Sequence, residues 1–231
     1  MRFFAFFLIG FLPLSVAVFA APREHRGTYF SVGTGIAYNS FRISETERDD
    51  LFIDGSCTFG VWKYKWEFGG WTFPALDFRF GRSVGNAVAI YGDFNFFMAS
   101  GKLKANKTFF PDDEILGMKF REETWKNVLG AFGCAGIGVE VYPFRNPNSF
   151  LRGFHFGNTY SFGADLARFD GGERSLTHGI GGFLRTNLGM DWWVSDTWML
   201  GMEISYMSPT VRMVNLKEKN TFQLLFRITR G

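Results

Sequence analysis

The chain has 231 residues, a length that predicts a single domain. Its formal net charge is only +3, and it contains neither a basic cluster nor an RNA-binding motif, which argues against a nucleic-acid partner. Its 30 phenylalanines, seven tryptophans, seven tyrosines and 28 glycines suit strands that expose aromatic side chains on one face and pack small residues on the other.

The first 20 residues have the pattern of a secretory signal peptide. Arg2 precedes an apolar run from Phe3 to Phe19, and the small residues that end at Ala20 provide a cleavage site. A retained membrane helix is the alternative, because the run approaches the roughly 20 residues that cross a bilayer. Pro13 and the Val-Phe-Ala ending favour cleavage. We therefore expect a signal peptide over residues 1–20 and one β-barrel domain over residues 21–231.

Residues 27–41 predict the first strand, because large side chains alternate with Gly, Ser and Ala along this stretch. Residues 42–71 predict a long outer loop, polar in SETERDD and aromatic in VWKYKWEF, whose second part extends into the second strand. That second part itself alternates aromatic with charged side chains. An additional strand is therefore the alternative here, and strands added in this loop would make the total ten.

The same period of two continues along the rest of the chain. It predicts seven further strands at residues 72–81, 88–98, 127–142, 154–166, 181–194, 198–207 and 222–229. Long polar connections at 42–71, 101–126, 167–177 and 208–219 alternate with short ones at 83–86, 143–153 and 195–197. Four long outer loops therefore lie at one end of the fold, and the short turns lie at the other end with both termini.

The hairpin at residues 181–207 shows how the two faces of the sheet differ. One face is uncharged and apolar, with Leu188 and Ile204 among its members, while the other carries Arg185, Asp191 and Glu203. Apolar side chains toward lipid and polar ones toward the lumen are the pattern of a transmembrane β-barrel. Turning the hairpin over would cost roughly 2–4 kcal/mol for a basic side chain near the bilayer midplane. The sequence therefore predicts an all-β fold, an eight-stranded antiparallel up-and-down transmembrane β-barrel.

Charged side chains occupy many inward positions of the predicted strands. They are Asp77, Arg79, Asp93, Glu140, Asp165, Arg185, Asp191, Glu203 and Arg227. An eight-stranded barrel is just wide enough for side chains to fill it, so these charges must pair or be hydrated. We expect a structural salt-bridge network that fills the lumen. A narrow, porin-like channel for small solutes is the alternative.

Aromatic side chains gather at both ends of the predicted strands. The turn side carries Tyr142, Phe144, Trp192, Trp193 and Trp198, and the loop side carries Tyr38, Trp71, Trp125, Tyr206 and Phe222. Girdles of aromatic residues mark the two membrane interfaces of transmembrane barrels. These ten residues therefore predict two aromatic girdles.

The glycine-rich first strand, GVEVYPF and LGMDWWVSDTWMLG resemble the small outer-membrane β-barrel families, such as the transmembrane domain of outer-membrane protein A and its eight-stranded relatives. The resemblance covers nearly all of the chain after the signal peptide. It implies a bacterial outer-membrane location, with outer-membrane lipids, lipopolysaccharide and the outer-membrane assembly machinery as partners. One departure is the ending FRITRG, which lacks the terminal aromatic residue that many such barrels carry.

The predicted function is structural or surface recognition through the outer loops, whose partner the sequence does not identify. We expect no enzymatic activity and no cofactor or metal site. The second alternative is a lipid-modifying enzyme, since some barrels that the chain resembles are acyltransferases or deacylases; its candidate residues are Ser175, His178 and Glu173. A third is a soluble, lipocalin-like barrel with reversed faces. Cys57 and Cys134 either form a disulfide or remain two idle thiols.

Overall fold

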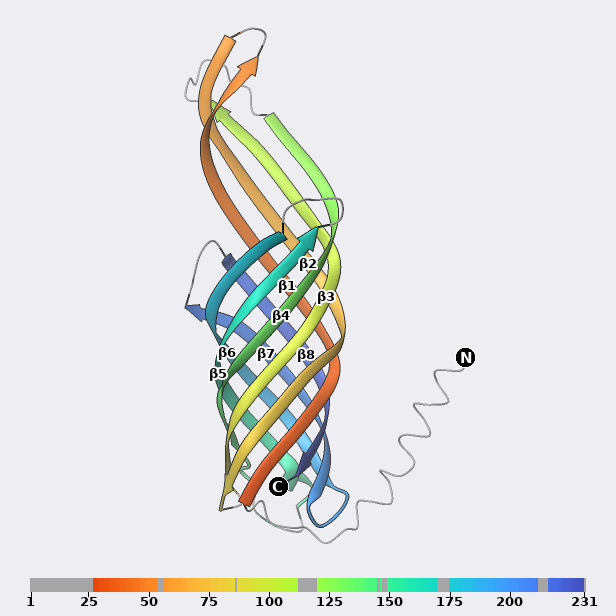
Figure 1. Cartoon of the computed structure of the whole chain (residues 1–231). Coiled ribbons are helices and arrows are strands. Elements are labelled where there is room, and N and C mark those ends of the chain that lie inside the picture. The colour runs from red at the N-terminus through yellow and green to blue at the C-terminus, as the bar shows by residue number, and fades with distance from the viewer. Residues whose placement is uncertain are drawn as a thin grey trace, which may run out of the picture.

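The computed structural model is a closed barrel in which each strand pairs antiparallel with the next and β1 pairs with β8 (Figure 1). The structure describes residues 27–53, 56–85, 87–111, 120–144, 146, 149–169, 175–211 and 216–230. Within these ranges, no helix is long and apolar enough to cross a membrane. The ring has eight strands, as the sequence predicted.

The strands differ widely in length. They are β1 (Gly27–Ile53), β2 (Ser56–Val84), β3 (Val88–Pro111), β4 (Phe120–Val141), β5 (Phe154–Phe169), β6 (Ser175–Trp193), β7 (Trp198–Val211) and β8 (Leu216–Arg230). A 3-10 turn, η2 (Phe150–Gly153), precedes β5. Short connections join the strands at the end where the C-terminus lies (Figure 1).

β1 to β4 extend well beyond the other four strands and form a projecting sheet (Figure 1). The last pair between β1 and β8 is Ile43 with Leu216, and the last pair between β4 and β5 is Val128 with Phe169. Beyond these pairs, in the described part of the chain, β1 and β4 each have one strand edge without a neighbouring strand. The projecting sheet therefore stands above the closed barrel with two free edges.

The projecting sheet corrects two of the predicted loops. Residues 42–53 and 56–71 lengthen β1 and β2, and residues 101–111 and 120–126 lengthen β3 and β4. The alternation at VWKYKWEF belongs to β2 itself, so it adds no strand to the ring. The loops were predicted too long because a strand pair that stands in water needs no apolar face and can therefore be as polar as a loop.

Inward and outward side chains alternate along each strand of the closed barrel. On β2, Asp77 is 0% exposed and Phe78 is 41% exposed; on β7, Glu203 is 0% exposed and Ile204 is 60% exposed. The charged face therefore lies inside and the apolar face outside. This arrangement is the reverse of a soluble barrel, whose interior would hold the apolar side chains.

The interior is layered along the barrel axis. Near the short turns lies an aromatic cluster of Tyr29, Ala89, Tyr91 and Tyr142. An apolar cluster fills the lumen toward the other end and contains Ala37, Ala75, Phe97, Phe132, Cys134, Phe183, Met207 and Leu225. A smaller cluster of Phe68, Ala99, Leu103 and Val128 follows where the projecting sheet begins. The charged side chains between the first two clusters form the site described next, whereas the buried Lys219 lies within the apolar cluster, over the ring of Phe132.

Candidate functional site: the filled lumen

Arg79, at the centre of the charged layer, lies within ion-pair distance of four carboxylates, the most distant of which belongs to Asp93 at 3.6 Å. Its Nη1 donates to Glu140 Oε1 at 2.8 Å and its Nε lies 2.9 Å from Asp77 Oδ2. Nη1 and Nη2 also donate to the two carboxylate oxygens of Glu203 at 2.8 and 2.5 Å. Period-two alternation on β2, β4 and β7 brings these groups to the same interior layer.

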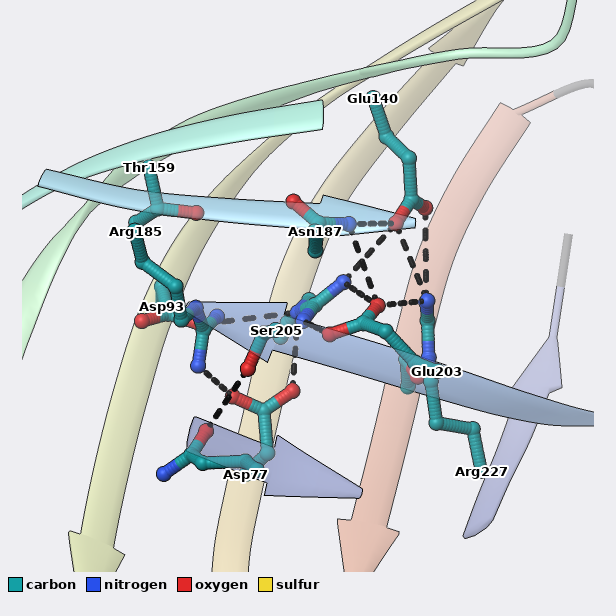
Figure 2. Close-up of polar contacts among 12 residues, drawn as sticks. Asp77, Asp93, Glu140, Thr159, Arg185, Asn187, Glu203, Ser205 and Arg227 are labelled. Atoms are coloured by element: carbon teal, nitrogen blue, oxygen red, sulfur yellow. Dashed lines mark hydrogen bonds and ion pairs between the residues drawn. The ribbon is translucent and has the colours of Figure 1, made fainter. Parts of the chain in front are cut away.

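Arg227 forms a second centre on β8. Its Nη1 donates to Glu140 Oε1 at 3.0 Å and to Glu203 Oε2 at 2.5 Å, as Figure 2 shows. Its Nη2 donates to the hydroxyl of Tyr29 at 2.5 Å, and this hydroxyl donates in turn to Glu140 Oε2 at 2.8 Å. The carboxylates of Glu140 and Glu203 therefore each accept hydrogen bonds from Arg79 and Arg227, and Tyr29 links Arg227 to Glu140.

Arg185 extends the network on its other side. Its Nη1 donates to Asp77 Oδ1 at 2.5 Å, and its Nη2 donates to Asp93 Oδ1. The amide nitrogen of Asn187 donates to Glu140 Oε1 at 3.0 Å and to Glu203 Oε2 at 3.1 Å (Figure 2). Removing a charge from water costs several kcal/mol, so such groups are stable inside only with several partners each.

His155 and Tyr142 link the network to Asp191. The Tyr142 hydroxyl donates to Glu140 Oε2 at 3.0 Å and to Asp191 Oδ2 at 3.4 Å. His155 Nδ1 lies 3.1 Å from the carbonyl oxygen of Gly153 and 3.6 Å from Asp191 Oδ2. Its other ring nitrogen lies 2.9 Å from Arg227 Nη1. The network thus reaches the aromatic cluster near the short turns.

A polar and then an apolar layer lie on the opposite side of the network. Gln223 Nε2 donates to Asn95 Oδ1 at 2.9 Å, and Ser205 Oγ donates to Gln223 Oε1 at 3.1 Å. Beyond them, the ring centroids of Phe97 and Phe132 are 5.0 Å apart. Phe183 completes the apolar layer, with its centroid 5.1 Å from that of Phe132 in an edge-to-face arrangement. Buried side chains therefore occupy successive layers along the axis.

The structure brings most of the predicted inward charges together. Asp77, Arg79, Asp93, Glu140, Arg185, Glu203 and Arg227 form one set of direct contacts, and Asp191 joins through Tyr142 and His155. The side chain of Asp165 lies outside the described residues. Sequence reasoning missed His155, Tyr29, Asn187 and Tyr142 as members. Their inward parity was the available signal. His155, Asn187 and Tyr142 each share a face with a predicted charge of the same strand, and Tyr29 shares its face with the small residues of the first strand.

Two residues of the predicted aromatic girdles belong inside the barrel. Tyr142 is 2% exposed and Trp193 is 8% exposed, so neither faces outward. Both share inward parity with the charge two residues earlier, Glu140 and Asp191 respectively, and this parity overrides their aromatic character. The girdle residues on the outer face are exposed or half-buried: Tyr38, Trp71, Phe144, Trp192, Trp198, Tyr206 and Phe222. The side chain of Trp125 lies outside the described residues.

Glu140, His155 and Glu203 have the spacing of a metal site, with ligand atoms that all lie within 4.8 Å of one another. Arg79 and Arg227 already donate to both carboxylates. A dication would have to displace these guanidinium groups or lie beside them, which like-charge repulsion opposes. The arrangement is therefore suited to internal charge pairing.

The residues of the catalytic and disulfide alternatives are only partly described. Glu173 and the side chains of Ser175, His178 and Cys57 lie outside the described residues. Cys134 is buried in the apolar layer as a free cysteine.

No protein-family model and no curated protein matches this sequence. Among solved structures, Ail, the attachment invasion locus protein of Yersinia pestis, is 12% identical with a TM-score of 0.43, over 88% of this chain and 99% of that chain. OprG, an outer membrane protein of Pseudomonas aeruginosa, is 12% identical with a TM-score of 0.42, over 89% and 97%. The outer membrane protease OmpT of Escherichia coli is 8% identical with a TM-score of 0.40, over 88% and 96%. The chain resembles small bacterial outer-membrane β-barrel proteins in fold.

Proposed function

We propose that this chain is an integral outer-membrane protein whose barrel is closed to solutes and whose projecting sheet acts at the cell surface. The polarity of the barrel supports the membrane location. Ile137 and Phe80 are 70% and 65% exposed, whereas Arg79, Arg185 and Arg227 are each 1% exposed. An exterior of this kind is stable against hydrocarbon. The soluble, lipocalin-like alternative would need an apolar ligand cavity where these arginines lie.

The single observation that carries the proposed closure is the mutual saturation of the central charges. Every carboxylate oxygen of Glu140 and Glu203 has a donor inside the barrel. An ion on the axis would have to break several charge-assisted hydrogen bonds, each about twice as strong as a neutral one. It would then meet the rings of Phe97, Phe132 and Phe183. These two obstacles favour a structural plug over a narrow solute channel.

Planar-bilayer recording of the purified, refolded protein tests the closure. We expect the current to stay at the level of a bilayer treated with detergent alone. Large unit conductance that is stable in time would contradict the plug and support the channel. Carbonate washing of membrane fractions tests the location separately, because an integral barrel stays in the pellet whether or not it conducts.

The short turns suggest which end faces the periplasm, since outer-membrane barrels have short periplasmic turns and longer extracellular segments. The projecting sheet would then face the outside. Lys63 and Lys102 are exposed on it, whereas Arg82 and Arg230 are exposed near the opposite rim. Cysteine variants at these four positions, made in a cysteine-free background, should react with an impermeant maleimide on intact cells only at 63 and 102. Labelling at 82 or 230 instead would reverse the proposed orientation.

We propose recognition, with no catalytic role, as the task of the projecting sheet. Its free edges on β1 and β4 present backbone donors and acceptors, which extended partners can pair with. The carboxylates of Glu140 and Glu203 are engaged by two arginines, which leaves them unsuited to substrate chemistry. Pull-down with the surface-exposed protein tests the role. A partner retained by the full chain and lost when residues 44–65 are replaced by a short turn is expected; retention by both would contradict it.

A further inference from the structure

The outward face of the projecting sheet carries four cations just above the loop-side girdle. We call Arg42, Lys65, Lys102 and Lys104 the cation ladder, because they lie in successive cross-strand rows of β1, β2 and β3. Arg42, Glu67 and Lys104 share one row, and Lys102 lies one row nearer to the barrel, opposite Gly69. The four cations lie outside the lumen, on the same outward face as Tyr38 and Trp71.

The carboxylates of this face engage only part of the ladder. Glu67 Oε1 lies 2.8 Å from Lys65 Nζ and 3.1 Å from Arg42 Nε, and Glu123 Oε1 lies 2.8 Å from Lys104 Nζ. Lys102 is exposed and has no acidic partner in the described part of the chain. Among the described residues, the ladder therefore ends, on the barrel side, in an ammonium group without an acidic neighbour.

A hydroxyl group lies beside this ammonium position. The ring of Tyr38 packs on Trp71 with centroids 5.1 Å apart. Its hydroxyl lies over Gly69, only 2.7 Å from where a Cβ atom of residue 69 would be. Gly69 pairs with Lys102, so the Tyr38 hydroxyl points toward the barrel-side end of the cation ladder at Lys102. We call this end the foot of the ladder. Among the described residues, this hydroxyl has no hydrogen-bond partner.

The height of the foot of the ladder is marked by exposed aromatic side chains. Trp71 is 64% exposed and Phe73 is 79% exposed, and they lie two and four residues from Gly69 along β2. Girdles of aromatic residues, to which Trp71 belongs, lie at the boundary between hydrocarbon and headgroups. Strand residues two apart are separated by about 6.6 Å. Lys102 therefore lies within one or two such steps of the girdle, which in a membrane would bring it to the headgroup region.

We propose that the foot of the ladder binds a phosphate group of an outer-leaflet glycolipid headgroup, with Lys102 as its main cation and the Tyr38 hydroxyl as a second donor. The inference rests on the proposed membrane location. From Lys102 to the row of Lys65 the ladder spans about 13 Å, which suits a headgroup with more than one phosphate. Charge-assisted hydrogen bonds to phosphate are the strong class, and the phosphate supplies the acceptors that both groups need.

Native mass spectrometry of the refolded protein in detergent tests the site. The probes are lipid A with two phosphates, the same lipid after removal of both phosphates, and sodium phosphate as a competitor. The test variant is Lys65→Gln/Lys102→Gln, and the matched control is Arg82→Gln/Arg230→Gln, which removes two exposed cations from the opposite rim. Heat-modifiable migration on gels checks that each variant is folded.

We expect the test variant to lose roughly 30-fold in affinity for the bisphosphorylated lipid, because each cation near the headgroups contributes about a factor of five. The control pair should bind like the wild type. Equal binding of the dephosphorylated lipid, or equal losses in both variants, would overturn the site. Displacement of the lipid by millimolar sodium phosphate would reassign the site to free phosphate and overturn the lipid claim. Carbonate washing, unaffected by these outcomes, reports separately on the membrane location.

Discussion

Arg79 on β2 and Glu203 on β7 form a two-point ion pair inside the barrel, with both guanidinium Nη atoms donating to the two carboxylate oxygens at 2.8 and 2.5 Å. The two strands are not neighbours in the ring. This pair therefore joins opposite parts of the barrel wall through its interior. Glu140 binds the same arginine from β4 at 2.8 Å, so three separate strands depend on one guanidinium group.

Arg79→Gln should lower the free energy of unfolding by about 3–5 kcal/mol, because it leaves buried carboxylates without their cation. Urea unfolding of the protein refolded into vesicles measures this loss. Arg82→Gln, at an exposed position of the same strand, should change stability by less than about 0.5 kcal/mol. Equal effects of the two substitutions would mean that the interior pairing contributes nothing.

The Arg79 and Glu203 substitutions should also be strongly non-additive. Each single variant, Arg79→Gln or Glu203→Gln, leaves an uncompensated partner in the lumen, whereas the double variant removes both charges of the pair. The double variant should therefore lose less stability than the sum of the two single losses, by about 0.5–3 kcal/mol. The same urea measurements give the comparison. Simple additivity would contradict direct pairing.

Phe132→Ala should cost about 3–5 kcal/mol, because the side chain is buried between Phe97 and Phe183 and its loss leaves a cavity. The barrel should still not conduct, since the charged layer below remains intact. Urea unfolding and bilayer recording measure the two quantities. Phe73→Ala is the control, because Phe73 is 79% exposed and its removal creates no interior cavity. A conducting Phe132 variant would assign the closure to the apolar layer alone.

Gly35→Ala should disrupt closure between β1 and β8. A Cβ atom at Gly35 would lie 1.9 Å from the carbonyl oxygen of Leu224 and 2.9 Å from the Cα of Leu225. Backbone must shift to accept it, which costs about 1–3 kcal/mol. At Gly92 the nearest atom to an added Cβ is 3.7 Å away, so Gly92→Ala should be tolerated. The folded yield of the two variants on heat-modifiable gels compares them, and similar yields would contradict the close approach.

The pKa of Glu67 should lie below its ordinary value, mainly because Lys65 donates to its carboxylate, with Arg42 adding to the effect. A lowered folded-state pKa stabilises the fold above the unfolded pKa, and this contribution disappears as the pH falls through the folded pKa. The group is largely solvated, so the contribution is small and weakens with salt. Carboxyl NMR titration in micelles should show the pKa rise in Lys65→Gln. An unchanged titration would remove Lys65 as the cause.

The strand count and the polarity of the two faces followed from the alternation itself, because lipid on one side and a narrow interior on the other constrain every second residue. The alternation did not predict which charged side chains contact one another inside the lumen. Arg79 reaches Glu203 across the barrel, and such a contact depends on strand tilt and register, which the alternation leaves open. The sequence could therefore predict which charges lie inside, but it could not predict which of them pair.

The prediction went wrong where it followed the type of a residue and ignored its position in the inward–outward alternation. Tyr142 follows the inward Glu140 by two positions, and its hydroxyl donates to that carboxylate. It was assigned to a girdle because tyrosine is typical of membrane interfaces. His155 lies on the inward face of β5 as well, but a lone histidine gives no sign of which carboxylates surround it. In both cases period two was the stronger guide.

The unequal lengths of the strands limit how far the hydrocarbon of a bilayer can extend along the outside of the barrel toward the projecting sheet. Above Ile43 on β1 and above Val128 on β4, in the part of the chain described, peptide groups on the outer edge have no neighbouring strand to bond. Acyl chains offer such groups no hydrogen bond, and a bare peptide edge in oil costs several kcal/mol per group. Water must therefore begin where the lateral pairing ends. The positions at which β1 and β4 lose their neighbouring strands therefore limit how deeply the barrel can insert into the hydrocarbon of the bilayer.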